Sequence, residues 1–315
     1  MFMNDREEIN MQDTFNNLIK RAADIQALCK DDVIAMNNVT VTNDLKFNGM
    51  DMTSFARGEL CGKLRIPSRY ISRCVEEHRE DLAADNLRSW MENDDRKIML
   101  RQYDGHIRGV MSGSYSRYDA PDILQSVKEV FGSRLTLKGS FLNDERLHLR
   151  LVETEMLPIE GEDLFAGVTL DSSDVGRSGL AVKFFIYKQV CTNGLTVAKS
   201  SGQLFRQKHI GLTYEEFKES LEEGLENFNE VKNKVTAMIQ NTHQIPLGED
   251  LEKVAKEVKD STKLSDEDIE EVISLAVNRY EPTRWGLING LTEVAQKFTL
   301  ERRLDLETIA GNMLA

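Results

Sequence analysis

The chain has 315 residues, 40% of them hydrophobic and 30% charged, with a formal net charge of −13 at pH 7. This length suits one large domain or two ordinary ones, and the hydrophobic content is sufficient for a core. No run of about 18 apolar residues occurs, and the acidic first residues contain no secretory signal, so we expect a cytoplasmic protein without a membrane span. A sequence pI near 5.0 excludes a protein that coats duplex DNA through its overall charge.

Motifs for catalysis and metal binding are missing from the sequence. The four cysteines form no closely spaced pair, and the five histidines show no ligand spacing. There is no phosphate-binding loop, no dinucleotide-binding glycine motif and no nucleophile elbow. We therefore expect a protein that is not an enzyme, with no cofactor and no metal site.

The first 95 residues read as a mixed helical and extended region. Apolar residues recur at helical spacing over residues 13–30, and shorter helical patterns follow over 53–64, 68–77 and 82–90. Residues 33–47 between them carry β-branched residues and turn signals, which favour extended structure.

Residues 96–211 are predicted to form a mostly antiparallel sheet. Asp104-Gly105 lies between two apolar runs, which is a strong hairpin signal because both turn residues require positive φ. A second hairpin spans residues 134–152, where leucines alternate with His148 and Arg150. This period of two predicts one buried face and one face in water. Two further strands are predicted over residues 164–170 and 180–190.

Residues 212–315 are predicted to be helical. Thr213 and Glu216 form a capping box, and apolar residues at helical spacing continue to about residue 240. We therefore predict an α+β fold with an N-terminal mixed part, a central sheet and a C-terminal helical region. Residues 215–281 carry 18 acidic and 8 basic residues, a net −10 of the chain's −13. This segment is either a solvated helical surface or a docking surface for a basic partner.

One window of forty residues, 175–214, contains no Asp or Glu. It combines Lys and Arg side chains with Phe184, Phe185, Tyr187 and Phe205. Cations offset phosphate charge and aromatic rings stack on bases, so this composition is typical of proteins that bind single-stranded nucleic acid.

Two short motifs have both a structural and a functional interpretation. Asn193-Gly194 reads as a tight turn after a strand; alternatively, the Thr192 hydroxyl and nearby amides form an anion cradle. Tyr115 to Tyr118 tethers a strand end to a helix capped by Asp119; alternatively, two stacking rings flank the phosphate-seeking Arg117.

Several stretches together resemble a known family. They are residues 66–70 (IPSRY), 82–90 (LAADNLRSW), 100–118 (LRQYDGHIRGVMSGSYSRY), 188–194 (KQVCTNG), 206–209 (RQKH) and 285–293 (WGLINGLTE). From about residue 55 to its end, the chain resembles the phage- and plasmid-like proteins filed as domain of unknown function 932. The resemblance implies a mobile-element protein in a bacterial host cell, and it implies no activity or catalytic residues.

We expect a nucleic-acid-binding protein that binds or anneals single strands during replication or recombination and assembles as a homo-oligomer. The alternative is a protein-binding inhibitor of a host defence system that docks a host protein on its acidic helices, and an uncharacterised enzyme is a third possibility. The candidate nucleic-acid-binding residues are Arg108, Tyr115, Arg117, Tyr118, Arg177, Lys183, Lys188, Thr192, Asn193, Gly194, Lys199, Arg206, Lys208 and His209.

Overall fold

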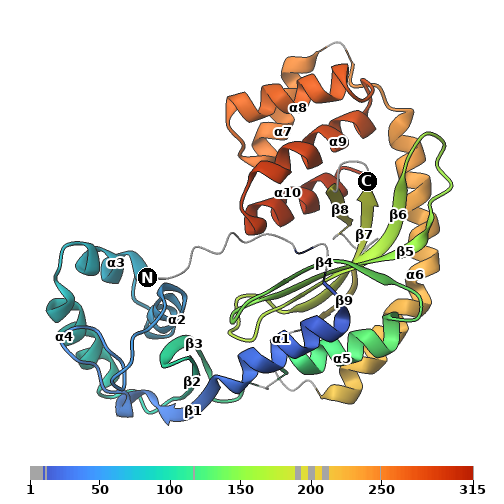
Figure 1. The fold of residues 1–315 in the computed structure, drawn as a ribbon. Helices are drawn as coiled ribbons and strands as arrows, with labels where there is room; N and C mark the ends of the chain where they lie inside the picture. Colours follow the sequence, from blue (N-terminus) through green and yellow to red (C-terminus); the bar gives the residue numbers. More distant parts are fainter. Residues whose placement is uncertain are drawn as a thin grey trace.

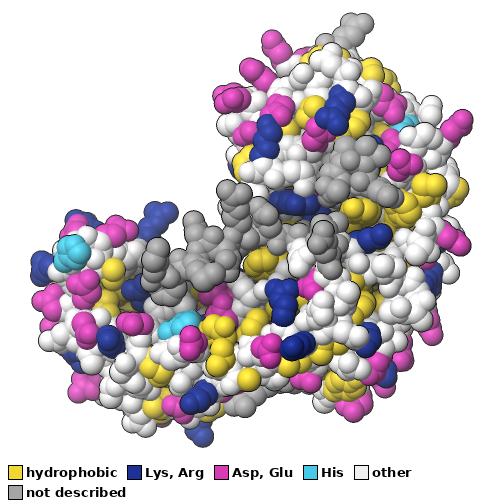
Figure 2. Space-filling model, in the orientation of Figure 1, with side chains coloured by type: hydrophobic (Ala, Val, Ile, Leu, Met, Phe, Trp, Pro, Cys, Tyr) yellow, Lys and Arg dark blue, Asp and Glu magenta, His cyan; other side chains and the backbone are white. Residues whose placement is uncertain are grey.

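The computed structural model describes residue 10 and residues 13–115, 118–188, 193–197, 203–207, 213–248 and 250–314. The chain forms an N-terminal lobe and a larger body that contains a large sheet and the C-terminal helices (Figure 1). The space-filling view shows a hollow between the lobe and these helices (Figure 2). The described part of the chain contains no helix long and apolar enough to cross a membrane.

The N-terminal lobe combines helices with a small antiparallel sheet in the order β1-β2-β3. Its core gathers apolar side chains such as Phe47, Leu60, Leu87 and Leu100, which are almost fully buried. The elements are β1 (Cys29–Ala35), the 3₁₀ turn η1 (Met36–Asn38), α2 (Ser54–Leu64), α3 (Ser68–Glu76), α4 (Glu80–Met91), β2 (Lys97–Tyr103) and β3 (His106–Ser112).

The first predicted hairpin is present but belongs to the small sheet. Asp104 and Gly105 have φ values of 44° and 81°, as their turn requires. Strand β2 pairs with β1 on its other side, so residues 97–112 do not extend the large sheet as expected. Hydrophobic pattern predicts a hairpin but does not specify which third strand will pair with it.

The large sheet has six strands among the described residues, in the order β4-β5-β6-β7-β8, and β9 also pairs with β7. β8 pairs with the second half of β7 and β9 with the first half, so both short strands lie along one edge of β7. The strands are β4 (Thr136–Leu142), β5 (Leu147–Met156), β6 (Leu164–Ser172), β7 (Leu180–Lys188), β8 (Asn193–Val197) and β9 (Gln203–Gln207).

One face of the large sheet builds the main core. Leu149, Val168 and Phe184 on this face are fully buried in the same cluster as Ile123 of α5 and Phe228 of α6. The elements that pack here include α1 (Phe15–Ala27), α5 (Ala120–Phe131) and α6 (Tyr214–His243). The predicted capping box of α6 is present, with Thr213 and Glu216 exchanging hydrogen bonds. Asp119 precedes α5, but its side chain accepts no hydrogen bond from the helix amides, because its carboxylate accepts from Arg101 and Gln26 instead.

The C-terminal helices complete the α+β fold. They stack above the sheet at one end of α6 (Figure 1). Helix α10 packs on β8, where the carbonyl of Thr196 lies so close to Gly311 that a Cβ at this position would collide with it. The remaining elements are α7 (Leu251–Thr262), α8 (Asp266–Asn278), α9 (Arg284–Val294), the 3₁₀ turn η2 (Ala295–Lys297) and α10 (Leu300–Asn312).

The tight turn predicted at Asn193-Gly194, with a positive φ at Gly194, is wrong, because both residues lie in strand β8. Gly194 is not among the residues with positive φ; it lies in β8 opposite Tyr187. Glycine is required there for a different reason, because a Cβ would overlap the ring of Phe185 and the carbonyl oxygen of Ile186.

We predict that Gly194→Ala destabilises the fold by about 1–3 kcal/mol, the usual cost of overpacking a buried site. Gly62→Ala in α2 is the matched control, since a Cβ there meets no atom within 4 Å. Alanine suits a helix better than glycine, so the control should be neutral or more stable by up to about 1 kcal/mol. Urea unfolding of both variants measures the difference, and equal stability of the two would contradict the packing argument.

Candidate binding site on the polar face of the large sheet

The second face of the large sheet carries polar residues in cross-strand rows. In one row Arg150, Thr169 and Lys183 are direct neighbours on β5, β6 and β7. In the next row His148 is opposite Asp171, and Arg206 of β9 is opposite Ala181. The sequence predicted that this face would lie in water, but His148, Arg150 and Thr169 are buried.

Helix α10 covers part of this face and is held there by a buried ion pair. Arg150 Nη2 lies 2.6 Å from Glu307 Oε2, and both side chains are fully buried. Arg303, one turn earlier on α10, approaches the other oxygen of Glu307 at 3.0 Å. The Arg150 guanidinium also stacks on the Phe185 ring at 5.0 Å. These contacts fix the position of α10 over β5 and β7.

Beside this pair, His148 and Asp171 form a buried dyad. His148 Nδ1 is 3.0 Å from Asp171 Oδ1, and Arg146 Nη2 donates to the same oxygen at 3.0 Å. Arg150 Nε donates to His148 Nε2 at 3.4 Å, so Nδ1 carries the proton that His148 donates to Asp171. Burial lowers the pKa of His148 and favours this neutral form. Burial alone would raise the pKa of Asp171, but His148 and Arg146 outweigh it and hold the pKa below its usual range.

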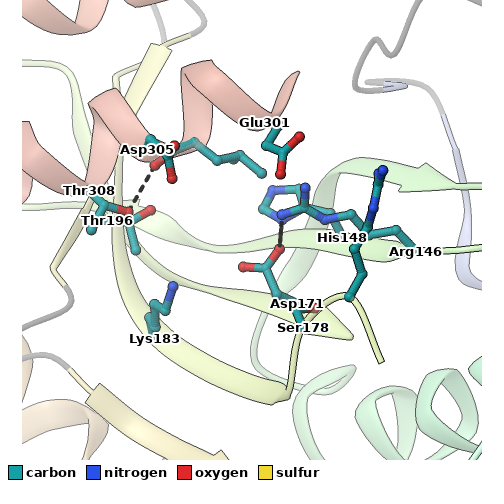
Figure 3. Close-up of a pocket in the computed structure, with 11 residues that line it drawn as sticks. Arg146, His148, Asp171, Ser178, Lys183, Thr196, Glu301, Asp305 and Thr308 are labelled. Atoms are coloured by element: carbon teal, nitrogen blue, oxygen red, sulfur yellow. Dashed lines mark hydrogen bonds and ion pairs between the residues drawn. The ribbon is translucent and has the colours of Figure 1, made fainter. Parts of the chain in front are cut away.

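A pocket opens between this dyad and the first turns of α10 (Figure 3). Its cavity volume is about 140 Å³. Two lining residues carry buried donor atoms: neither Arg146 Nε nor the Ser178 hydroxyl has a hydrogen-bond partner among the described residues. The lining residues are Arg146, His148, Asp171, Arg177, Ser178, Lys183, Thr196, Glu301, Leu304, Asp305 and Thr308.

The structure brings three of the sequence-predicted cations together at this face. Lys183 and Arg206 project from the same side of the sheet, since Arg206 is opposite Ala181, two residues before Lys183 on β7. Arg206 is exposed and Lys183 half-buried, and neither has an ion-pair partner in the described ranges. Arg177 lines the pocket, is 3.5 Å from Glu145 and stacks on Phe55 of α2. Several Lys and Arg side chains lie in the hollowed region above the sheet (Figure 2).

Two other predicted cations are enclosed by the fold. Arg108 is 1% exposed and lies 3.1 Å from Cys29 Sγ and 4.0 Å from Asp174. Lys188 pairs with Glu162 at 2.8 Å and donates to Asn289. Buried charges are held by partners inside the protein. Neither side chain is therefore available to a phosphate at the surface.

The predicted stacking rings are also in the interior. Phe184, Phe185 and Tyr187 are buried in β7, so they pack the protein instead of offering a face to bases. Tyr118 is buried against Phe217 in an edge-to-face contact and hydrogen-bonds Ser126. Tyr115 is half-buried, and its hydroxyl donates to the Ser173 carbonyl at 3.2 Å. Tyr115 and Tyr118 therefore fit the structural interpretation, in which they tether the end of a strand to the following helix.

Most of the remaining candidates lie outside the described residues. Gly194 serves packing, as shown above, and nothing is described for the side chains of Asn193 and Phe205. The anion-cradle interpretation stays a prediction for this reason. The candidates beyond the described ranges are Arg117, Thr192, Lys199, Lys208 and His209.

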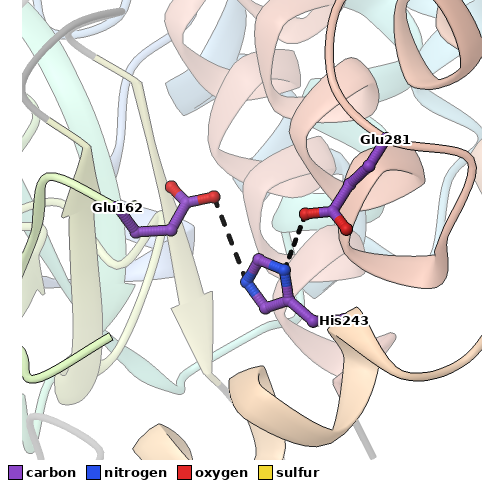
Figure 4. Close-up of side chains that lie close together, drawn as sticks. All are labelled: Glu162, His243 and Glu281. Atoms are coloured by element: carbon purple, nitrogen blue, oxygen red, sulfur yellow. Dashed lines mark hydrogen bonds and ion pairs between the residues drawn. The ribbon is translucent and has the colours of Figure 1, made fainter. Parts of the chain in front are cut away.

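A second polar cluster joins the end of α6 to the loop before β6 (Figure 4). His243 Nδ1 lies 2.7 Å from Glu281, and His243 Nε2 lies 4.0 Å from Glu162. These three side chains are close enough to suggest a cation site. However, the two carboxylates face opposite ring nitrogens, and Glu162 already accepts from Trp285 at 2.6 Å and pairs with Lys188. The cluster therefore fits a structural bridge better than a metal centre.

A network of buried charges joins the lobe to the large sheet. Arg101 contacts Asp31, Asp119 and the carbonyl of Asp174, and these charges raise its pKa although burial alone would lower it. Glu59 of α2 accepts from the Val110 amide at 2.9 Å, and burial raises its pKa to about 7. An amide at the edge of β3 therefore donates to a carboxyl group that is protonated at mildly acidic pH.

The sequence analysis selected Arg177 and Lys183 but none of the other residues that line the pocket. Alternation along β5 placed His148 and Arg150 on the face opposite the leucines, which was the one available signal. Glu301 and Asp305 share one side of α10 and Glu307 lies on another, but no local pattern shows that the side with Glu307 meets a strand more than one hundred residues earlier. Long-range contacts of this kind are visible only in the folded chain.

Comparison with family models matches residues 108–310 to the family described as Domain of unknown function (DUF932). The chain belongs to this family. The resemblance seen in the sequence is therefore confirmed, and the match contains the large sheet, the pocket and nearly all of α10. Comparison with curated proteins and with solved structures finds no match.

We predict that Glu307→Ala costs about 3–5 kcal/mol of folding free energy, because it leaves Arg150 buried without its partner. A double variant, Arg150→Met with Glu307→Leu, removes both charges and should recover most of that loss. Urea unfolding of the single and double variants tests this. A double variant no more stable than Glu307→Ala would show that the charge pair is not what holds α10.

We also predict a pH effect at the lobe junction. Because the folded-state pKa of Glu59 is about 7, above the ordinary value of about 4.3, its contribution to stability is present below pH 4.3 and is lost as pH rises through 7. Glu59→Gln keeps an acceptor for Val110 and stays neutral. Stability of the wild type relative to Glu59→Gln should therefore fall between pH 5 and pH 8 in urea unfolding. A difference that stays constant with pH would refute the raised pKa.

Proposed function

We propose that this protein binds single-stranded nucleic acid along the polar face of the large sheet. The proposal rests on one observation: Lys183 and Arg206 lie on the same side of the sheet, and neither side chain has an ion-pair partner among the described residues. Cations without internal partners are available to phosphates, and the release of counterions from nucleic acid favours such contacts.

The distribution of charge supports a local rather than a global mode of binding. The exposed carboxylates of α6, such as Glu222 and Glu226, lie on another element, away from the polar face. A protein with a net charge of −13 repels nucleic acid over most of its surface. Binding is thus expected only where the cations face the hollow, in which several Lys and Arg side chains lie (Figure 2).

Because the aromatic rings of β7 are buried, phosphate contacts and not base stacking carry the affinity in this proposal. Such contacts do not depend on base sequence. Assembly of several copies along one strand would extend the same mode of binding to the annealing of two strands. We therefore include a homo-oligomer in the proposal.

We predict that Lys183→Glu with Arg206→Glu lowers oligonucleotide affinity at least about tenfold, since two phosphate contacts become repulsive. The log–log salt slope should fall in magnitude by about 1.4, because each phosphate contact to a single strand contributes about 0.7. Fluorescence anisotropy with a labelled 20-nucleotide strand at several salt concentrations measures both quantities.

Lys253→Glu with Lys256→Glu is the matched control. Both lysines are exposed on α7, and the two substitutions change the net charge by the same amount. A loss of affinity equal to that of the control would mean that only net charge matters. Absence of binding by the wild type at low salt would refute the proposal. The exposed carboxylates of α6 would then favour the second candidate, a surface that docks a basic host protein.

A further inference from the structure

The lobe meets the body at a junction that contains few connections. The chain crosses between them twice, after α1 and between β3 and α5. The loop between β6 and β7, residues 173–179, also reaches from the body against the lobe. Its Val175 is fully buried, and a Cβ at Gly109 of β3 would lie 2.9 Å from Val175 Cβ. With two crossings and one inserted loop, the lobe can swing as a unit when the contacts of this loop change.

Two carboxyl groups lie where this loop meets the lobe. Glu59 Oε2 accepts from the Val110 amide at 2.9 Å, and Glu59 Oε1 is 3.3 Å from the place that a Cβ would take at Gly176 of the loop. Asp174, in the same loop, is 15% exposed, and its carboxylate lies 4.0 Å from Arg108 of β3. Helix α2, strand β3 and the loop therefore meet at Glu59 and Asp174.

The other strongly charged groups of the junction balance one another in the described part of the chain. Three are arginines and three are carboxylates that take part in ion pairs there: Arg101, Arg108 and Arg177, with Asp31, Asp119 and Glu145. When Glu59 and Asp174 are protonated, positive and negative charges are equal in number. When both are ionised, two negative charges are added without two further cations.

The remaining titratable neighbours do not restore this balance. Lys63, one turn after Glu59 on α2, makes no ion pair in the described ranges, and burial lowers its pKa. The Cys29 thiol and the Tyr115 hydroxyl lie near Asp174. Burial raises the pKa of each, so both are uncharged at neutral pH. Lys63 therefore offsets at most part of one added charge.

Burial moves the titration of both carboxyl groups toward neutral pH. It raises the pKa of Glu59 to about 7 and the pKa of Asp174 to about 6, and the negative charges of Glu145 and Asp119 act in the same direction. Carboxyl groups in water titrate at about pH 4. Protonation of these two groups therefore stabilises the closed junction at low pH, and this contribution is lost as pH rises through 7.

We infer that the junction is a pH-sensitive hinge, which is closed when Glu59 and Asp174 are protonated and opens when both are ionised. Ionisation places two extra negative charges between α2, β3 and the inserted loop. Such charges are costly inside a protein and are hydrated when the lobe moves away from the loop. The hollow between the lobe and the C-terminal helices (Figure 2) changes shape with this movement. The inference does not depend on the proposed function, because pH alone drives the change.

Small-angle X-ray scattering of the full chain, measured behind a gel-filtration column, tests the hinge in the wild type. The radius of gyration should increase between about pH 5.5 and about pH 8.5, with most of the change complete one unit above the higher pKa, at about pH 8. Far-UV circular dichroism over the same range should stay constant, because a hinge moves the lobe without unfolding it.

The variant Glu59→Gln with Asp174→Asn keeps the size of both side chains and an acceptor oxygen on each, but neither can ionise. At about pH 8 it should keep the smaller radius of gyration of the wild type at low pH. Hydrogen–deuterium exchange at that pH should be slower in α2 and β3 of the variant than of the wild type, and equal in α7 and α8.

Glu222→Gln with Glu226→Gln is the matched control, because it removes the same number of charges from exposed positions on α6. This control should open with pH as the wild type does. A radius of gyration of the wild type that does not change with pH would overturn the inference. An increase that persists in the Glu59 and Asp174 variant, or one that accompanies a loss of helical signal, would also overturn it.

Discussion

The buried pair of Arg150 and Glu307 is the contact on which the site depends. It joins the middle of the large sheet to the last helix of the chain, and both side chains are fully removed from solvent. Moving two charges out of water is expensive, and their attraction and hydrogen bonds offset this cost only with good geometry. Here the second oxygen of Glu307 meets Arg303, and Phe185 lies under the guanidinium of Arg150. In the described part of the chain this pair is the polar contact between α10 and β5, and the close packing of Gly311 on β8 adds to it.

The same pair explains why the polar face is neither a core nor an open surface. Rows of His, Arg, Thr, Asp and Lys side chains would be solvated on an uncovered sheet. Helix α10 covers the rows nearest β8 and leaves Lys183 and Arg206 at the edge. A protein with a strongly acidic surface thus keeps a small group of cations facing the hollow. Their isolation from the acidic helices makes local binding of an anionic chain physically reasonable.

Local structure was predictable from the sequence where short-range chemistry decides it. The Asp104-Gly105 turn, the capping box at Thr213 and the leucine face of β5 all form as expected. The α+β class followed from the same patterns. Tertiary packing decided the rest: Phe184 and Phe185 are adjacent and lie on opposite faces of β7, yet both are buried. Gly194 looked like a turn residue and is a strand residue that leaves room for Phe185.

The candidate site was predictable only in part. The absence of acidic residues in one window led to Lys183 and Arg206, because charge composition is local information. Arg108 and Lys188 were chosen by the same criterion and are internal, since composition does not reveal a buried partner such as Asp174 or Glu162. The dyad and the carboxylates of α10 required knowledge of which helix packs on which face. That knowledge comes from contacts far apart in the sequence.

Hydrogen–deuterium exchange of the full chain with and without a single-stranded oligonucleotide tests the central claim most directly, since it locates the bound strand without any mutation. The account predicts slower exchange in β7 and in the first turns of α10 when the strand is bound, with α7 and α8 unchanged. Protection confined to the acidic helices, or to the N-terminal lobe, would contradict the assignment of the polar face as the binding site.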